Sequence, residues 1–179
     1  MSQTVTAVQA PVAIGRYDGH TNYASADFVV ASGVTINAGD FVYFSGTTGT
    51  VTNATVSQAR LLGMAEGGSA NPVTGTATGT VTVTVCIDPH MRYLLKGATA
   101  FGTVTNGVST SVGQFYDISG ATGAQTITTS SAGTTTGQFL CISVPGVTGF
   151  PNLGLQGLTA NLYGIFILIS SALNPYVAG

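Results

Sequence analysis

The sequence predicts an all-β fold, a barrel or sandwich of short strands, with two related halves packed together behind an extended N-terminal arm. Three observations lead to this prediction. No long segment repeats apolar residues at the helical spacing of about 3.6 residues. Short runs rich in Val, Ile, Thr and aromatic residues are instead separated by Gly and Ser clusters, which is typical of strands joined by turns. Finally, one stretch of the chain nearly repeats another.

The repeat relates Val34–Gly46 to Val108–Gly120, an offset of 74 residues (108 − 34 = 74). Each copy has a glycine before a short aromatic run and ends in Ser-Gly. Because both copies predict a turn, a strand and a second turn, the chain is interpreted as one β unit used twice. A weaker similarity continues the repeat through two further strands, pairing Leu61–Met64 with Phe139–Ile142 and Val81–Ile87 with Tyr163–Ile169.

The chain is divided accordingly into an N-terminal arm (1–23), a first β half (24–96) and a second β half (97–179). The arm starts with an uncharged stretch that favours an extended conformation. We expect either an edge strand or a segment that reaches a neighbouring subunit, where it can add a strand to a sheet edge. The arm residues expected to make that contact are Val5, Ala7, Val8, Pro11 and Val12.

Strands are expected throughout the first half, and the clearest is Thr80–Val85. Thr and Val alternate strictly there, so one face of the strand must be buried. Val81, Val83 and Val85 are therefore predicted to face a core, and the threonines to face outward. The other strands expected in this half are Phe28–Ala31, Phe41–Phe44, Leu61–Ala65 and Arg92–Lys96.

In the second half the most informative strand is Leu162–Ile169, which is apolar on both faces. Such a strand is either central and covered on both sides, or has one face against another subunit. Ile165 and Ile167 are therefore candidate interface residues, as is Tyr176 in the extended C-terminal tail. The other strands expected in this half are Gln114–Ile118, Gln125–Thr129 and Phe139–Val144.

The composition excludes several classes of function. Charged residues make up 6% of the chain, against about 25% in an average soluble domain. Four Lys and Arg residues cannot form the basic patches needed to bind nucleic acid or an anionic membrane surface. No apolar stretch approaches the roughly 20 residues of a membrane-spanning helix. A net charge of −2 gives little self-repulsion, so we expect partners in an assembly to cover much of the surface.

No catalytic, cofactor-binding or metal-ligating site is predicted. Asp18 and Asp88 each stand two residues before a histidine, His20 and His90, and two such pairs are compatible with a metal site. Asp-Gly and Asp-Pro are also turn sequences, and turns are the prediction here. The chain contains no Gly-Lys-Ser/Thr phosphate-binding loop and no Gly-x-Ser-x-Gly nucleophile motif.

The cysteines and tyrosines favour structural roles. Cys86 and Cys141 lie in expected strands and are predicted to be buried apolar side chains, with a disulfide between the halves as the alternative. Tyr17, Tyr23 and Tyr93 are interpreted as packing or interface residues.

Several segments together resemble the decoration (cement) proteins of tailed-bacteriophage capsids: Val30–Val42, Leu61–Ala65, Gly79–Ile87 and Gly113–Ile118, with the closing apolar strand. The resemblance extends over Phe28–Ser170. It implies a non-enzymatic, cofactor-free, all-β virion protein, assembled in the host cytoplasm, that sits on the capsid exterior in many copies and stabilises it. The partners that it implies are the major capsid protein and copies of the chain itself, as a dimer or trimer.

Two other classes of function stay open from the sequence. One is another virion component, such as a tail or fibre protein, or a β-rich module that binds surface glycans. The other is a hydrolase with a diffuse site. Co-purification with a major capsid protein in fixed stoichiometry would favour a virion component, whereas binding of the free protein to sugar arrays would favour a glycan-binding module.

Overall fold

The computed structural model describes residues 11–46, 49–55, 60–66, 72–128, 137–148 and 162–169. Within these ranges the secondary structure consists of sixteen β-strands, and no helix is present. The strands pair antiparallel in every sheet. The predicted all-β fold is therefore confirmed.

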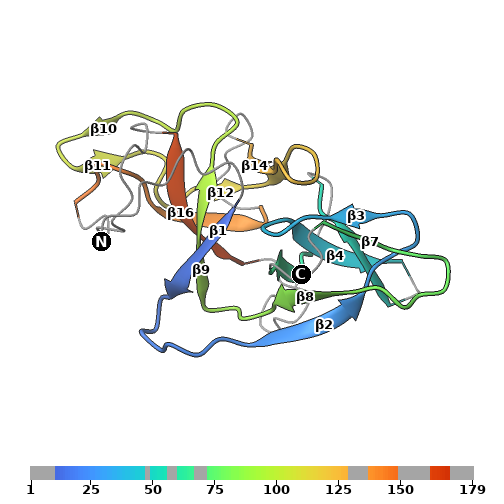
Figure 1. Ribbon diagram of the computed structural model, residues 1–179. Helices are drawn as coiled ribbons and strands as arrows, with labels where there is room; N and C mark the ends of the chain where they lie inside the picture. The colour runs from blue at the N-terminus through green and yellow to red at the C-terminus, as the bar shows by residue number, and fades with distance from the viewer. Residues whose placement is uncertain are drawn as a thin grey trace, which may run out of the picture.

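Two five-stranded sheets form the body of the molecule (Figure 1). The first sheet has the order β2 (Ser25–Val29), β8 (Thr82–Cys86), β6 (Gly63–Ala65), β4 (Phe41–Ser45) and β5 (Thr50–Asn53). The second sheet has the order β1 (Val12–Arg16), β9 (Met91–Lys96), β16 (Tyr163–Leu168), β15 (Phe139–Ser143) and β12 (Phe115–Tyr116). Short pairs flank them: β3 (Thr35–Ile36) with β7 (Val73–Thr74), β10 (Val104–Thr105) with β11 (Val108–Ser109), and β13 (Ile118–Ser119) with β14 (Thr126–Ile127).

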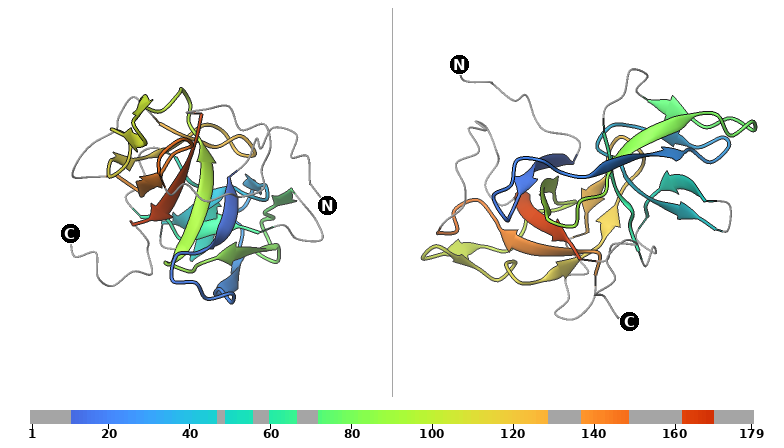
Figure 2. Two further views of the ribbon diagram at one scale, coloured as in Figure 1. Left: turned by 90° about the vertical axis from the view of Figure 1, so that its left-hand side faces the viewer. Right: turned by 90° about the horizontal axis from the view of Figure 1, so that it is seen from below.

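The two sheets repeat one strand order and one register. Strands β9, β16, β15 and β12 of the second sheet follow the same order as β2, β8, β6 and β4 of the first. Phe41 pairs with Met64 in the first sheet, and Phe115, 74 residues further on (115 − 41 = 74), pairs with Leu140 in the second. The duplication inferred from the sequence therefore has a counterpart in the strand pairing. We call β2 to β8 the first unit and β9 to β16 the second unit; Figure 2 shows them side by side.

The turn before the repeated aromatic run is also the same in both units. Gly39 and Gly113 have φ angles of 88° and 83°, in the left-handed region that favours glycine. The Gly39 N–H donates to the carbonyl of Ala65 at 2.8 Å, and the Gly113 N–H donates to that of Cys141 at 2.9 Å. The two units therefore share the backbone conformation of this turn and the hydrogen bond that its glycine donates.

In each unit an isolated parallel bridge curls the strands toward each other: it joins the end of β2 to β5 in the first unit, and the end of β9 to β14, outside the five-stranded sheet, in the second. Val30 bridges Val51 in the first unit, and Gly97 bridges Ile127 at the matching place in the second. Apart from such bridges, the ladders of the described residues remain open sheets, so the arrangement is sandwich-like and not a continuous barrel.

The strand at Met91–Lys96 lies in the second unit, although the sequence analysis placed it at the end of the first half. It pairs with β16 through Tyr163 and Lys96, as β2 pairs with β8 through Thr82 and Val29. Its Tyr93 and Leu95 side chains also belong to the core of the second unit. The units therefore meet in the turn between β8 and β9, and β1, from the predicted arm, forms an edge strand of the second sheet.

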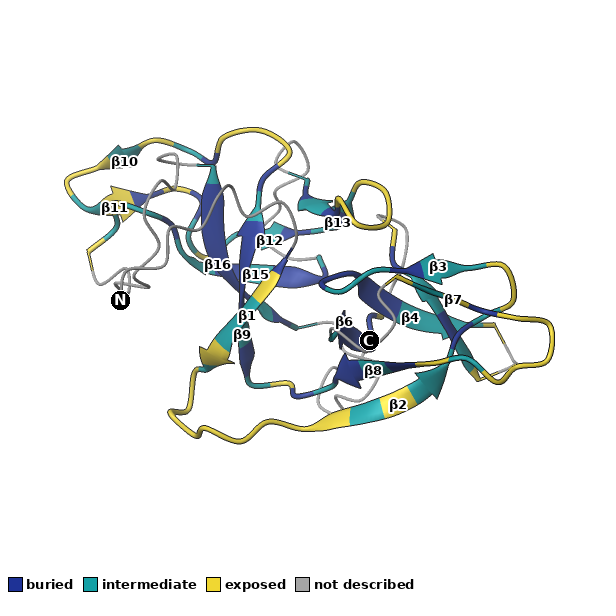
Figure 3. Ribbon diagram, in the orientation of Figure 1, coloured by how far each residue is buried: buried dark blue, intermediate teal, exposed yellow. Residues whose placement is uncertain are grey.

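Three groups of buried side chains stabilise the fold. Figure 3 shows that the buried residues lie mainly on the strands, while the connecting loops are exposed. One fills the curl of the first unit and contains Val83 and Val85, which are 6% and 0% exposed, while Thr82 is exposed. The predicted inward face of this strand is confirmed for these two valines. Val81 is partly buried and packs against the same cluster.

The largest cluster joins the two units. The ring of Phe41, on β4, lies 5.0 Å from the ring of Tyr93 and 4.8 Å from that of Phe139, both edge-on. Cluster members from the first unit, such as Met64 and Cys86, pack with the side chains that fill the curl of the second. Since these side chains are shared, this cluster is a single core that extends through both units.

Candidate functional site

The structure describes four of the residues predicted to make intersubunit contacts. Pro11 is buried and Val12 is 38% exposed. Ile165 is 1% exposed and clusters with Leu94 on the far side of the second sheet, while Ile167 is half-buried. The apolar strand is thus central and covered on both faces, the first of the two explanations given above. The other predicted contact residues, Val5, Ala7, Val8 and Tyr176, lie outside the described residues.

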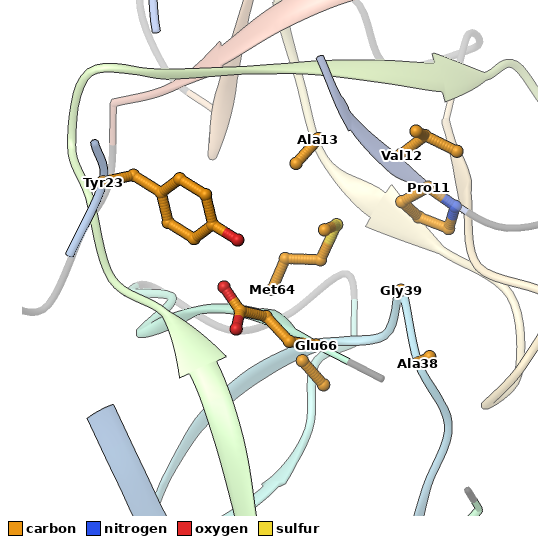
Figure 4. A pocket seen from close by; sticks show the side chains of 9 residues that line it. Pro11, Val12, Ala13, Tyr23, Ala38, Gly39, Met64 and Glu66 are labelled. Carbon is orange, nitrogen blue, oxygen red and sulfur yellow. The ribbon is translucent and has the colours of Figure 1, made fainter. Parts of the chain in front are cut away.

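An open hollow of about 460 Å³ lies between β1 and the first unit (Figure 4). Pro11, Val12 and Ala13 form one wall, so two of the predicted contact residues border it. The repeated Gly39 turn and the end of β6 form the opposite side. The remaining lining residues are Tyr23, Ala38, Gly39, Met64, Ala65 and Glu66.

Two polar side chains face each other at the mouth of this hollow. Figure 4 shows the Tyr23 hydroxyl directed toward the Glu66 carboxylate. The carboxylate raises the pKa of Tyr23 above its ordinary value, because an ionised phenol would place a second negative charge beside it. Tyr23 is 50% exposed, so the pair is open to solvent and to a binding partner. With an apolar wall and one carboxylate–phenol pair, the hollow has the character of a binding surface.

A charged cluster fixes the loop between β1 and β2. Arg16 forms ion pairs with Asp18 and with Asp88, which is 2% exposed. The hydrogen bond from the Arg16 guanidinium lowers the pKa of the Asp18 carboxyl below its usual range. Each aspartate also accepts a hydrogen bond from the backbone N–H two residues later, at 3.2 Å for His20 and 2.8 Å for His90. The predicted turns at both tripeptides are confirmed.

A second polar cluster joins the two units beside the hollow. The Asp40 carboxylate, from the repeated turn of the first unit, is 1% exposed. It accepts hydrogen bonds from the backbone N–H groups of Asn37 at 2.8 Å and of Gly123 at 2.7 Å, and from the hydroxyl of Thr122. Because Thr122 and Gly123 belong to the second unit, one buried carboxylate links the two repeats.

A buried glutamine adds backbone bonds to the same junction. Gln125, from the second unit, accepts a hydrogen bond from the Phe41 N–H at 2.6 Å. Its amide donates in turn to the carbonyls of Phe41 and Ala54. The side chain thus extends the ladder between β4 and β5 by further hydrogen bonds at the end where the first unit meets the second.

The two cysteines are free and buried, as predicted. Burial raises the pKa of Cys141 to about 12 and also raises that of Cys86. The thiolate is the reactive form, so both thiols are poor nucleophiles in the folded chain. Among the described residues, no three His, Cys, Asp or Glu side chains gather as a metal-binding group. No helix in the described part of the chain is long and apolar enough to cross a membrane.

The state of these thiols gives a direct test of the fold. Iodoacetamide is expected to leave Cys86 and Cys141 unmodified in the folded protein at mildly alkaline pH, because little thiolate is present and the side chains are covered. In denaturant both should be alkylated, as counted by intact mass. Labelling of either cysteine in the native protein at the rate seen in denaturant would contradict its burial.

Nothing in the sequence indicates the hollow. Tyr23 was interpreted as an ordinary packing or interface residue, and Met64 and Glu66 carried no signal for a site. These residues meet only because β6 pairs with β8 while β1 crosses to the other sheet. The spacing of these residues along the sequence therefore does not predict that they lie close together.

The comparisons with known proteins add no family to these observations. No protein-family model matches the chain, and a search of curated proteins finds no match to its sequence.

Proposed function

We propose that this protein is a decoration protein that binds the outside of a bacteriophage capsid in many copies and stabilises the shell. The observation that carries the proposal is the small amount of charge left on a folded surface. Of six acidic residues, Asp40 and Asp88 are buried, and Arg16, one of four basic residues, is paired with two carboxylates. A surface with so few charges loses little hydration free energy when neighbouring subunits cover it.

The proposed action needs no chemical step. A protein that binds the assembled shell and not its separated subunits shifts the equilibrium toward the shell by mass action. Each copy has to contribute only a small free energy, because many copies act on one particle. The two units suit this role because they share a hydrophobic core and are joined by hydrogen bonds to the buried Asp40 carboxylate. Units joined in this way move little relative to each other, so a bound copy would resist deformation of the capsid surface under it.

A second candidate function is glycan binding, favoured by exposed aromatic side chains around the loop from β1 to β2. Tyr17 and Tyr23 are 52% and 50% exposed, and the Tyr17 ring lies 5.2 Å from the ring of His90. Exposed rings combine an apolar face with a polar edge, the combination that recognises sugars. Binding to sugar arrays by the free protein would favour this function.

The decoration proposal is tested on particles prepared with and without the protein. Particles that lack it are expected to assemble but to break at a lower temperature, as followed by release of packaged DNA. Adding the purified protein should restore stability in proportion to the number of copies bound. The Val83→Asp variant, which is expected not to fold, is the matched control. Equal heat resistance of particles with and without the protein would overturn the proposal. If the protein is found only on the tails of the particles, the tail or fibre alternative is favoured.

A further inference from the structure

The two units differ at one edge of their sheets. In the second unit, β1 covers the outer edge of β9, with Val12 paired to Leu94. In the first unit, the matching edge belongs to β2, and no strand of the described residues runs along it. Since the pairings of β2, β8, β6 and β4 recur in β9, β16, β15 and β12, the open β2 edge marks the place where the first unit lacks the strand that the second possesses.

The backbone groups at this edge are oriented to receive a strand. The Ile87 N–H donates to the Ala24 carbonyl, and the Val30 N–H donates to the Val81 carbonyl at 2.9 Å. Because bonding alternates along an antiparallel strand, the even-numbered residues of β2 bond to β8. The N–H and C=O groups of Ser25 and Asp27 therefore point away from the sheet. Arg92 and Leu94 present the same groups to β1 in the second unit.

We propose that the open edge of β2 receives residues 2–9 of a second copy of this chain as an added strand. Main-chain hydrogen bonds would then complete the first unit as β1 completes the second. The inference goes beyond the proposed function and does not depend on it, because it concerns association of the purified chain with itself.

The chemistry of the edge favours this occupant over direct pairing of two β2 strands. Asp27 is exposed in the middle of β2, where its carboxylate accepts a hydrogen bond from Thr84 at 2.6 Å. Two β2 strands paired about their centres would set two such carboxylates opposite each other, which is unfavourable. Residues 2–9 carry no charge and alternate Thr4 and Thr6 with Val5 and Ala7, so they can pair with the edge without this repulsion.

The arm is long enough to pair along all five residues of β2. Ten residues precede Pro11, and an extended chain of this length spans up to about 33 Å. The donor segment and the acceptor edge are different parts of the chain, so the contact is head-to-tail. Such contacts close into rings or continue as chains.

The test uses full-length variants and measures mass by sedimentation. Asp27→Pro removes the outward N–H of the acceptor edge, and Asp27→Ala is its matched control, since both lose the bond to Thr84. The double variant Val5→Pro with Thr6→Pro blocks the donor in either register, and the corresponding double alanine variant is its control. Circular dichroism checks that each variant folds. If Asp27→Pro does not fold, Ser25→Pro replaces it, because proline is tolerated at the first residue of a strand.

The wild-type chain and both alanine controls are expected to associate at high micromolar concentration, and each proline variant alone should be monomeric. Mixing the two proline variants should restore association as one-to-one dimers, since one has an intact donor and the other an intact acceptor. A monomeric wild-type chain would overturn the proposal, and it is the result expected if the arm pairs within its own molecule. Association that survives both proline changes would also overturn it, by pointing to another surface.

Discussion

Replacing Asp40 with alanine is expected to lower the free energy of unfolding by about 2–3 kcal/mol. The carboxylate is buried and accepts hydrogen bonds from Asn37, Gly123 and Thr122. Alanine would remove three hydrogen bonds to a buried charged group, and bonds to a charged group are the stronger kind. Thr122 and Gly123 are exposed, so water can replace part of what their donors lose. Because two of the donors come from the second unit, the loss falls on the junction between the repeats.

Urea unfolding followed by circular dichroism measures the effect. Asp27→Ala is the matched control, because Asp27 is an exposed aspartate whose carboxylate accepts a hydrogen bond from Thr84. The control is expected to cost no more than about 1 kcal/mol. If the two variants lose similar stability, the Asp40 carboxylate does not hold the units together.

Replacing Val83 with aspartate is expected to prevent stable folding, with a loss of about 4 kcal/mol or more. Val83 is 6% exposed and lies in the cluster inside the first unit, so the new carboxylate would have neither water nor a partner. The same charge introduced at Thr82, one residue earlier on the exposed face of β8, is expected to change stability by about 0.5 kcal/mol.

The comparison is made by thermal unfolding and by the yield of soluble protein. The two variants have the same net charge and lie in the same strand, so they differ only in the face that carries the aspartate. A Thr82→Asp variant less stable than Val83→Asp would show that the inward face of β8 has been assigned wrongly.

Side-chain patterns predicted the strands with strong apolar character and missed those held by backbone pairing. Thr50–Asn53 forms β5, which is mostly polar and was not expected. An edge strand was one alternative for the arm, but its place at Val12–Arg16, β1, was not indicated, because this segment contains a glycine and an arginine. Their hydrogen bonds come from neighbours that local sequence does not reveal. The expected strand Gln114–Ile118 is divided, because β12 pairs with β15 while β13 pairs with β14. In the first unit, β4 makes both kinds of pairing without a break.

The candidate site was predictable only in part, for a related reason. Pro11 and Val12 were identified because an uncharged, extended arm favours contacts. Tyr23 and Glu66 were not, because they come together through the register of strands distant in sequence. The position of the unit boundary was missed likewise: nothing in Met91–Lys96 itself shows whether it pairs with β8 or with β16.

The placement of β1 affects the order in which the chain can fold as it is synthesised. Among the described strands β1 leaves the ribosome first, but its partner β9 follows only after every strand described in the first unit has emerged. The first unit can therefore curl around its own valines while the second is still being made. β1 must wait as an unpaired nascent segment until β9 is available, and β9 in turn gains its other neighbour, β16, only near the end of translation. β1, the first of the described strands to be made, is thus among the last to be locked in place, so the outer edge of the second sheet is completed only after translation has passed β9.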